Sequence, residues 1–170
     1  MKKVLKLTLL MAMVLCTSSI FAQKFGRINV NEIITVMPET REAQTNFEAY
    51  RQDLANTIET MQVELNTKYQ AFQKDEATLT ESMKQLKWKE IQDLSARIEE
   101  FQQSAQQEMQ QKYAELMNPV HEKAMAAIKK VAQAGGYLVV FETASLVYMD
   151  EAQLTDIAPE VKAELGIAAN

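Results

Sequence analysis

Residues 38–75 read PETREAQTNFEAYRQDLANTIETMQVELNTKYQAFQKD, and their pattern sets the architecture of the whole chain. Apolar and aromatic side chains recur here at steps of three or four residues, and polar residues fill the intervals. The members of this stripe are Phe47, Tyr50, Leu54, Ile58, Met61, Leu65, Tyr69 and Phe72. That spacing predicts one long helix with a narrow apolar face. At about 1.5 Å per residue, such a helix would be about 57 Å long.

A second helix of at least similar length is expected to run back along the first. Between residues 75 and 82 the stripe lapses, and Thr78, Thr80 and Ser82 appear, which are residue types typical of helix ends. This segment is the expected tip of a helical hairpin, with Thr80 or Ser82 capping the return helix. Apolar residues then resume at helical spacing until Gly135 and Gly136, where glycine is expected to end the helix.

Pro119 lies inside the expected return helix. A proline in that position removes one backbone hydrogen bond and clashes with the preceding turn. Because the apolar stripe keeps its phase beyond Pro119, the expected result is one kinked helix and not two separate helices. Pro119 is therefore the candidate hinge of the helical arm.

Short strand patterns flank the two long helices. Residues 24–30 contain aromatic and β-branched side chains, and Ile28 and Val30 alternate with Arg27 and Asn29, which predicts a half-buried strand. A short helix is expected between this strand and Pro38. Residues 137–142 and 146–149 are both rich in apolar strand-forming residues, and together they predict a β-hairpin. Residues 159–165 are expected to form a closing helix.

These elements predict an α+β chain that is predominantly α. Residues 23–37 and 135–170 are expected to form a small β body, and residues 38–134 a long antiparallel coiled-coil hairpin arm. Two or three strands bury too little apolar surface to be stable by themselves. A chain with so small a body is expected to complete its core by forming an oligomer.

Residues 1–22 have the features of a secretory signal peptide. Lys2, Lys3 and Lys6 precede an apolar run at residues 7–14, and the segment closes on Ala22. The run falls short of the ~20 apolar residues that span a bilayer, so we expect cleavage after Ala22 and no retained anchor. The mature chain is therefore expected outside the cytoplasm, without stable insertion in a membrane.

The composition argues against enzymatic and nucleic-acid-binding roles. Cys16 is the only cysteine and lies in the expected signal peptide, and His121 is the only histidine, so no catalytic triad, cysteine metal site or histidine cluster is expected. The chain has 18 basic and 23 acidic residues; without the three signal lysines the balance is 15 against 23, a formal charge of −8. A strongly basic nucleic-acid binder does not have this balance. We therefore expect no enzyme, no cofactor and no nucleic-acid partner.

Three segments resemble the Skp (OmpH) family of periplasmic chaperones. They are GRINV at residues 26–30, LVVF at residues 138–141 and LTDIAPEV at residues 154–161. In the last segment Asp156, Ile157 and Val161 match the family pattern, whereas Ala158 stands where the family has threonine. The resemblance covers the whole mature chain.

The resemblance implies an ATP-independent holdase of the periplasm, which prevents unfolded outer-membrane proteins from aggregating. It implies a homotrimer in which strands of three chains form a central barrel-like body, and three helical arms surround the cavity that holds the client. By the same resemblance, the residues expected to pack the trimeric body are Ile28, Val30, Leu138, Val140 and Leu146.

Met83 and Trp88 are the candidate client contacts, because they lie near the expected tip and partly off the apolar stripe. The alternative function is a structural or adaptor hairpin that links folded components of the cell envelope. An adaptor would make tight contact with one folded partner, whereas a holdase would make loose contacts with many unfolded chains.

Overall fold

The computed structural model of the protein describes residues 23–167, so the expected signal peptide and its cleavage after Ala22 lie outside the described residues. The elements in chain order are β1 (Lys24–Ile28), α2 (Val30–Val36), α3 (Pro38–Asp75), the 3-10 helix η1 (Glu76–Thr78), α4 (Glu81–Ala134), β2 (Tyr137–Glu142), the 3-10 helices η2 (Thr143–Ser145) and η3 (Glu151–Gln153), β3 (Thr155–Asp156) and α5 (Ala158–Glu164). Helix predominates, which confirms the expected mostly helical chain with a small sheet. The described residues form two compact units, one of residues 31–126 and one of residues 23–30 with 127–167.

α3 begins and ends where the apolar stripe predicts. Pro38 occupies its first position, where the missing N–H has no helical partner to lose. Met37 before it is extended, with ψ of 136°, as a residue preceding proline favours. The buried hydroxyl of Thr40 donates a hydrogen bond to the carbonyl of Ile34, which fixes the turn into the helix.

The tip of the hairpin consists of η1, Leu79 and Thr80. Thr80 precedes α4 directly, and its Oγ1 accepts a hydrogen bond of 3.4 Å from the backbone N–H of Met83. On the other side of the turn, the hydroxyl of Thr78 donates to the carbonyl of Asp75 at 2.8 Å. Backbone groups at a helix end have no partner within the helix. Here the hydroxyls of Thr78 and Thr80 bond to one such group at the end of α3 and one at the start of α4.

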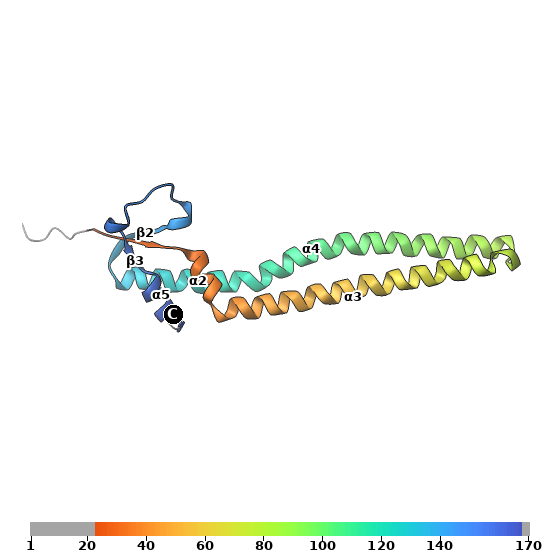
Figure 1. Cartoon of the computed structure of the whole chain (residues 1–170), viewed down its shortest axis with the longest axis horizontal. Helices are drawn as coiled ribbons and strands as arrows, with labels where there is room; N and C mark the ends of the chain where they lie inside the picture. The colour runs from red at the N-terminus through yellow and green to blue at the C-terminus, as the bar shows by residue number, and fades with distance from the viewer. Residues whose placement is uncertain (1–22, 168–170) are drawn as a thin grey trace, which may run out of the picture. The chain divides into compact units, whose positions relative to one another are not determined.

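α4 runs from Glu81 to Ala134 as one helix with Pro119 inside it, as the unbroken phase of the stripe predicts. Figure 1 shows α3 and α4 side by side, and shows that α4 bends along the hairpin. Gly136 follows the helix with a φ of 68°, a left-handed conformation that glycine adopts without strain.

The two helices of the hairpin bury only a narrow seam. In residues 31–126 the buried side chains are Ile33, Ile34, Met37, Thr40, Ala43, Ile91, Leu94, Ile98, Ala105, Met117, Val120 and Ala124. The stripe of α3 beyond Ala43 is only half-buried, as at Leu54 and Ile58, and Tyr69 is exposed. Two helices therefore cover the apolar stripe incompletely, and apolar surface remains open along the seam.

The sheet has three strands in the order β2-β1-β3, and both outer strands pair with β1 in parallel. Gly26 on the central strand faces Val140 on one side and Thr155 on the other. A Cβ atom at Gly26 would lie 3.2 Å from side-chain atoms of both Tyr137 and Val140, and 3.3 Å from Ile157. A methyl group here would be tightly packed, and the neighbouring side chains would have to shift by a few tenths of an ångström to accept it.

The predicted β-hairpin over residues 137–142 and 146–149 is wrong. β2 forms, but residues 146–149 are not a strand, and β3 pairs with β1 instead. The carboxylate of Glu142 explains the difference: it accepts hydrogen bonds from the backbone N–H of Ala144 at 3.1 Å and of Val30 at 3.0 Å. These bonds direct the chain into η2 at the end of β2, so it does not reverse tightly. Val30, which the pattern placed on the first strand, begins α2.

Candidate functional site

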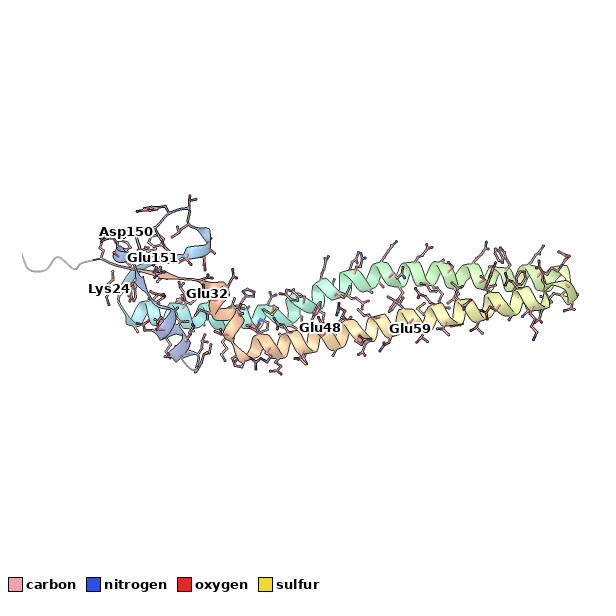
Figure 2. The ribbon with its side chains drawn as sticks, viewed as in Figure 1. Lys24, Glu32, Glu48, Glu59, Asp150 and Glu151 are labelled. Carbon is pink, nitrogen blue, oxygen red and sulfur yellow. The ribbon has the colours of Figure 1, made fainter. Side chains whose placement is uncertain are left out.

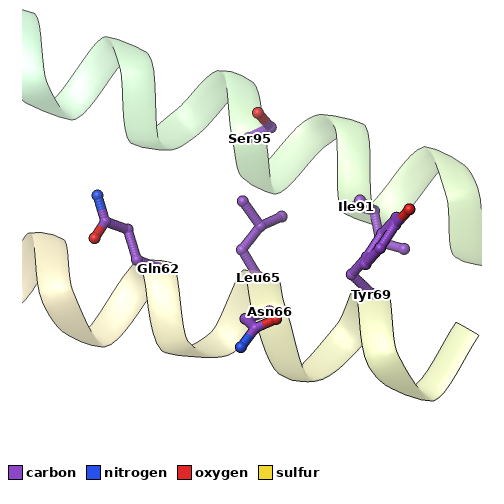
Figure 3. Close-up of a pocket in the computed structure, with 6 residues that line it drawn as sticks. All are labelled: Gln62, Leu65, Asn66, Tyr69, Ile91 and Ser95. Atoms are coloured by element: carbon purple, nitrogen blue, oxygen red, sulfur yellow. The ribbon is translucent and has the colours of Figure 1, made fainter.

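Open hollows follow the seam between α3 and α4. Figure 3 shows one of about 310 Å³, in which Leu65 points from α3 towards α4. Its lining residues are Gln62, Leu65, Asn66, Tyr69, Ile91 and Ser95. The apolar side chains come from the seam and the polar ones are uncharged, so this wall can contact apolar groups and also form hydrogen bonds.

Two further hollows adjoin each other nearer the base of the hairpin. They measure about 400 and 450 Å³, and both include Gln106 and Met109 in their walls. The first is also lined by Arg51, Leu54, Ala55, Ile58, Gln102 and Ala105, and the second by Phe47, Gln110 and Tyr113. Together they form a groove with aromatic and aliphatic side chains on the α3 side and glutamines along α4.

The tip of the hairpin exposes large apolar side chains. Trp88 retains 44% of its surface exposed, although its ring centroid lies 5.8 Å from that of Phe72. Met83 is exposed to a similar degree, so both candidate client contacts are accessible in the single chain. Leu86 is also exposed, which the sequence did not predict because Leu86 continues the stripe of the return helix. The tip therefore presents accessible apolar surface on α4.

Polar groups connect the two helices in the proximal half of the hairpin. The hydroxyl of Tyr50 donates a hydrogen bond of 2.8 Å to Glu108, and this bond to a carboxylate raises the pKa of Tyr50. Lys112 lies 6.0 Å from the centroid of the Tyr50 ring and pairs with Glu115 at 3.1 Å. Figure 2 shows the side chains along both helices, with Glu48 and Glu59 labelled on α3.

Pro119 lies beside an ion pair at the base of the hairpin. Lys123 donates to the carboxylate of Glu39, and this hydrogen bond lowers the pKa of Glu39. All three residues line a hollow of about 270 Å³. The candidate hinge is therefore next to a contact that joins α3 and α4.

The residues expected in the trimeric body occupy different environments in the single chain. Ile28 is buried, whereas Val30 and Val140 are half-buried. Leu138 is 60% exposed on β2, and Leu146 is also exposed. β2 is an outer strand of the sheet. Val139 on β2, and Val147 and Tyr148 in the segment after it, add to the exposed apolar surface. An unpaired strand edge with apolar side chains is a ready surface for pairing with another chain.

Other kinds of site find little support in residues 23–167. No group of three or more His, Cys, Asp or Glu side chains there is arranged to hold a metal ion. None of the helices in this part of the chain is both long and apolar enough to cross a bilayer. Nη2 of Arg27 forms ion pairs with Glu151 at 3.3 Å and with Asp156 at 3.8 Å, both within the sheet unit.

Nearly the whole described chain is similar to one protein family. The family described as outer membrane protein (OmpH-like) matches residues 24–165. The chain is 28% identical over 151 residues to chaperone protein Skp of Yersinia enterocolitica, which covers 86% of this chain and 90% of that protein. It is 29% identical over 130 residues to chaperone protein Skp of Photorhabdus laumondii subsp. laumondii, which covers 75% of this chain and 77% of that protein.

A solved structure shares the fold. The crystal structure of an OmpH-like outer membrane chaperone from Caulobacter crescentus matches with a TM-score of 0.75, over 84% of this chain and 83% of that one. The two sequences are 14% identical in this match, so the likeness concerns the fold alone.

Proposed function

Because this chain belongs to the OmpH-like family of outer membrane chaperones, we propose that it is an ATP-independent holdase of the periplasm. It binds unfolded outer-membrane proteins and prevents their aggregation, without enzymatic activity and without a cofactor. The signal peptide at residues 1–22 directs it to the periplasm, and the mature chain begins at Gln23.

The observation that carries this proposal is the row of open hollows along the hairpin. Each has a volume of a few hundred Å³, and each is lined by apolar side chains together with polar ones. Such surfaces offer many weak contacts that tolerate different client sequences. A strand-rich client chain held by such contacts is kept apart from the other chains with which it would aggregate.

The active holdase is a homotrimer in this proposal. The exposed apolar side chains of β2 and of residues 146–148 support it, because contiguous apolar surface of this kind is usually covered by a partner. Strands from three chains form the body, packed by Ile28, Val30, Leu138, Val140 and Leu146 as the family resemblance implies. The three hairpins then enclose the client in a cavity.

Met83 and Trp88 contact the client near the tip of each hairpin, and Pro119 is the hinge that adapts the arm to clients of different size. Trp88 is the only tryptophan in the chain, so its fluorescence reports on this contact directly. The Phe72 ring supports one side of the indole, and the exposed side is free for the client.

The test compares an unfolded outer-membrane barrel protein with the same protein already folded in detergent micelles. The client is made without tryptophan, so that the signal comes from Trp88 alone. We expect the unfolded client to shift the Trp88 emission to shorter wavelength, because the indole loses water contacts, and the folded client to leave it unchanged. Binding of folded envelope proteins in preference to unfolded ones would favour an adaptor hairpin instead.

A further inference from the structure

Six of the ten residues from 102 to 111, QQSAQQEMQQ, are glutamines. They form two rows along α4 with a spacing of four residues in each. The first row, here called the groove row, is Gln102, Gln106 and Gln110, and the second, here called the outer row, is Gln103, Gln107 and Gln111. The groove row lines the two adjoining hollows near Met109, and no residue of the outer row lines either of them.

The amide groups of the groove row are available to a ligand. All three side chains are exposed, and within residues 23–167 none of them forms a side-chain hydrogen bond. Two glutamines of α3 differ in this respect: Gln52 donates to Asn56 at 2.9 Å, and Gln70 donates to Asn66 at 3.4 Å. The groove row thus presents unused donors and acceptors beside an apolar floor.

The spacing of the groove row suits the backbone of an extended chain. Residues four apart on a helix are about 6 Å apart along its axis, at about 1.5 Å per residue. An extended strand presents a backbone N–H and C=O on the same side every second residue, about 6.6 to 6.8 Å apart. The difference over the three glutamines is about 1 to 2 Å, which their flexible side chains can absorb.

The chemistry of the groove fits the same ligand. A primary amide carries both a donor and an acceptor, so one glutamine can pair with both backbone groups of a client residue. Residues 101–107 on the α4 side of the groove contain no charged side chain. On the α3 side Arg51 also lines the groove, and it pairs with Glu48 at 2.7 Å. The α4 wall at these residues therefore discriminates little between basic and acidic client segments.

We propose that the groove row of Gln102, Gln106 and Gln110 binds the main chain of an extended, unfolded polypeptide through amide hydrogen bonds. This inference rests on the proposed holdase function and specifies what the hairpin recognises. The client's side chains on one face contact the apolar floor at Ala105 and Met109, while its backbone edge pairs with the glutamines. Recognition of the backbone explains how one groove serves clients without a common sequence.

The test replaces the groove row in the full mature protein, as Gln102→Met, Gln106→Met and Gln110→Met together. Methionine keeps the length and helix propensity of glutamine but cannot donate an amide hydrogen bond. The matched control is the same triple change in the outer row, at Gln103, Gln107 and Gln111. The single change Gln106→Met is the milder variant should the triple change disturb the helix, which circular dichroism reports.

The probes are two labelled peptides of alternating threonine and valine, one unmodified and one with every backbone nitrogen methylated. Methylation removes the N–H donors of both strand edges and keeps the side chains, so a change in the affinity ratio between the wild type and a variant reports hydrogen bonding to the peptide N–H groups. We expect the wild type and the outer-row control to prefer the unmodified peptide. Three lost hydrogen bonds reduce that preference about tenfold in the groove-row variant, and Gln106→Met reduces it about twofold.

An unchanged affinity ratio in both groove-row variants would overturn the inference while leaving the holdase intact. A wild-type ratio near one, with normal binding of unfolded outer-membrane proteins, would overturn it in the same way. Failure of the wild type to bind any unfolded outer-membrane protein would instead refute the proposed function itself, so the two failures are distinguishable.

Discussion

The hydroxyl of Tyr50 on α3 donates a hydrogen bond of 2.8 Å to Oε2 of Glu108 on α4, and this bond joins the two helices across the seam. The bond requires the proton of Tyr50, and the carboxylate of Glu108 raises the pKa of that hydroxyl. A folded-state pKa above the unfolded value contributes stability at pH values below the unfolded pKa. That contribution is lost as the pH rises through the raised pKa of Tyr50.

Glu108→Gln should therefore lower the pKa of Tyr50. The glutamine carries no charge, so it no longer disfavours the tyrosinate at this position. The measurement is the ultraviolet absorbance of tyrosinate in an alkaline titration, in which Tyr50 should ionise at a lower pH in the variant than in the wild type. Glu99→Gln, at an exposed position of α4, is the matched control. Identical titration curves for Glu108→Gln and the wild type would contradict the assignment.

Gly26→Ala should destabilise the sheet unit, because the new methyl group meets side chains of Tyr137, Val140 and Ile157 at 3.2 to 3.3 Å. Overpacking of this kind costs about 1 to 3 kcal/mol in the free energy of unfolding. Urea unfolding measures the loss. Val140→Ala opens space at one of these contacts, so it should cost less in the Gly26→Ala background than in the wild type. Strictly additive losses would show that the two positions do not interact.

Leu138→Lys should weaken the proposed trimer, because it places a charge on an exposed apolar residue of the outer strand β2. Sedimentation velocity should show a shift from trimer towards monomer over a range of protein concentrations. Val63→Lys on α3 is a closely matched control, since Val63 and Leu138 are both 60% exposed in the single chain. A Leu138→Lys protein that sediments as the wild-type trimer does would exclude this face from the interface.

Local signals in the sequence predicted the hairpin well. Pro38, Thr80 and Gly136 act on the backbone within a few residues of themselves, and the structure places them at helix ends. The strand pattern at residues 146–149 failed because an apolar run indicates burial or contact but not the partner strand. At the end of β2 the carboxylate of Glu142 accepts a hydrogen bond from Val30, 112 residues away in sequence, and no local pattern reveals such a contact.

Exposure near the tip of the hairpin was predicted in part. Met83 and Trp88 lie partly off the stripe, and both are exposed. Leu86 lies on the stripe and is exposed nevertheless, because two helices bury only a narrow seam. The groove row was missed although its signal, six glutamines in ten residues, is present in the sequence. Only the structure separates the three that line the groove from the three that do not.

Pro119→Ala should stiffen the arm and narrow the range of client sizes that the protein accepts. Alanine restores a backbone N–H that can bond to the carbonyl of Glu115, and it removes the steric cause of a kink. The measurement is the affinity for a small and for a large unfolded barrel protein, with Asn118→Ala as the neighbouring control that keeps the proline. Equal affinities of the variant and the wild type for both clients would remove the hinge role from Pro119.

The most direct test of the holdase is light scattering after a urea-unfolded outer-membrane barrel protein is diluted into buffer with the mature chain, without nucleotide. The chain is titrated in trimer equivalents against a fixed amount of client. We expect suppression of scattering that saturates near one trimer per client, as enclosure of one client by three hairpins requires. Undiminished scattering at every excess of the chain would contradict the holdase and favour an adaptor between folded envelope components.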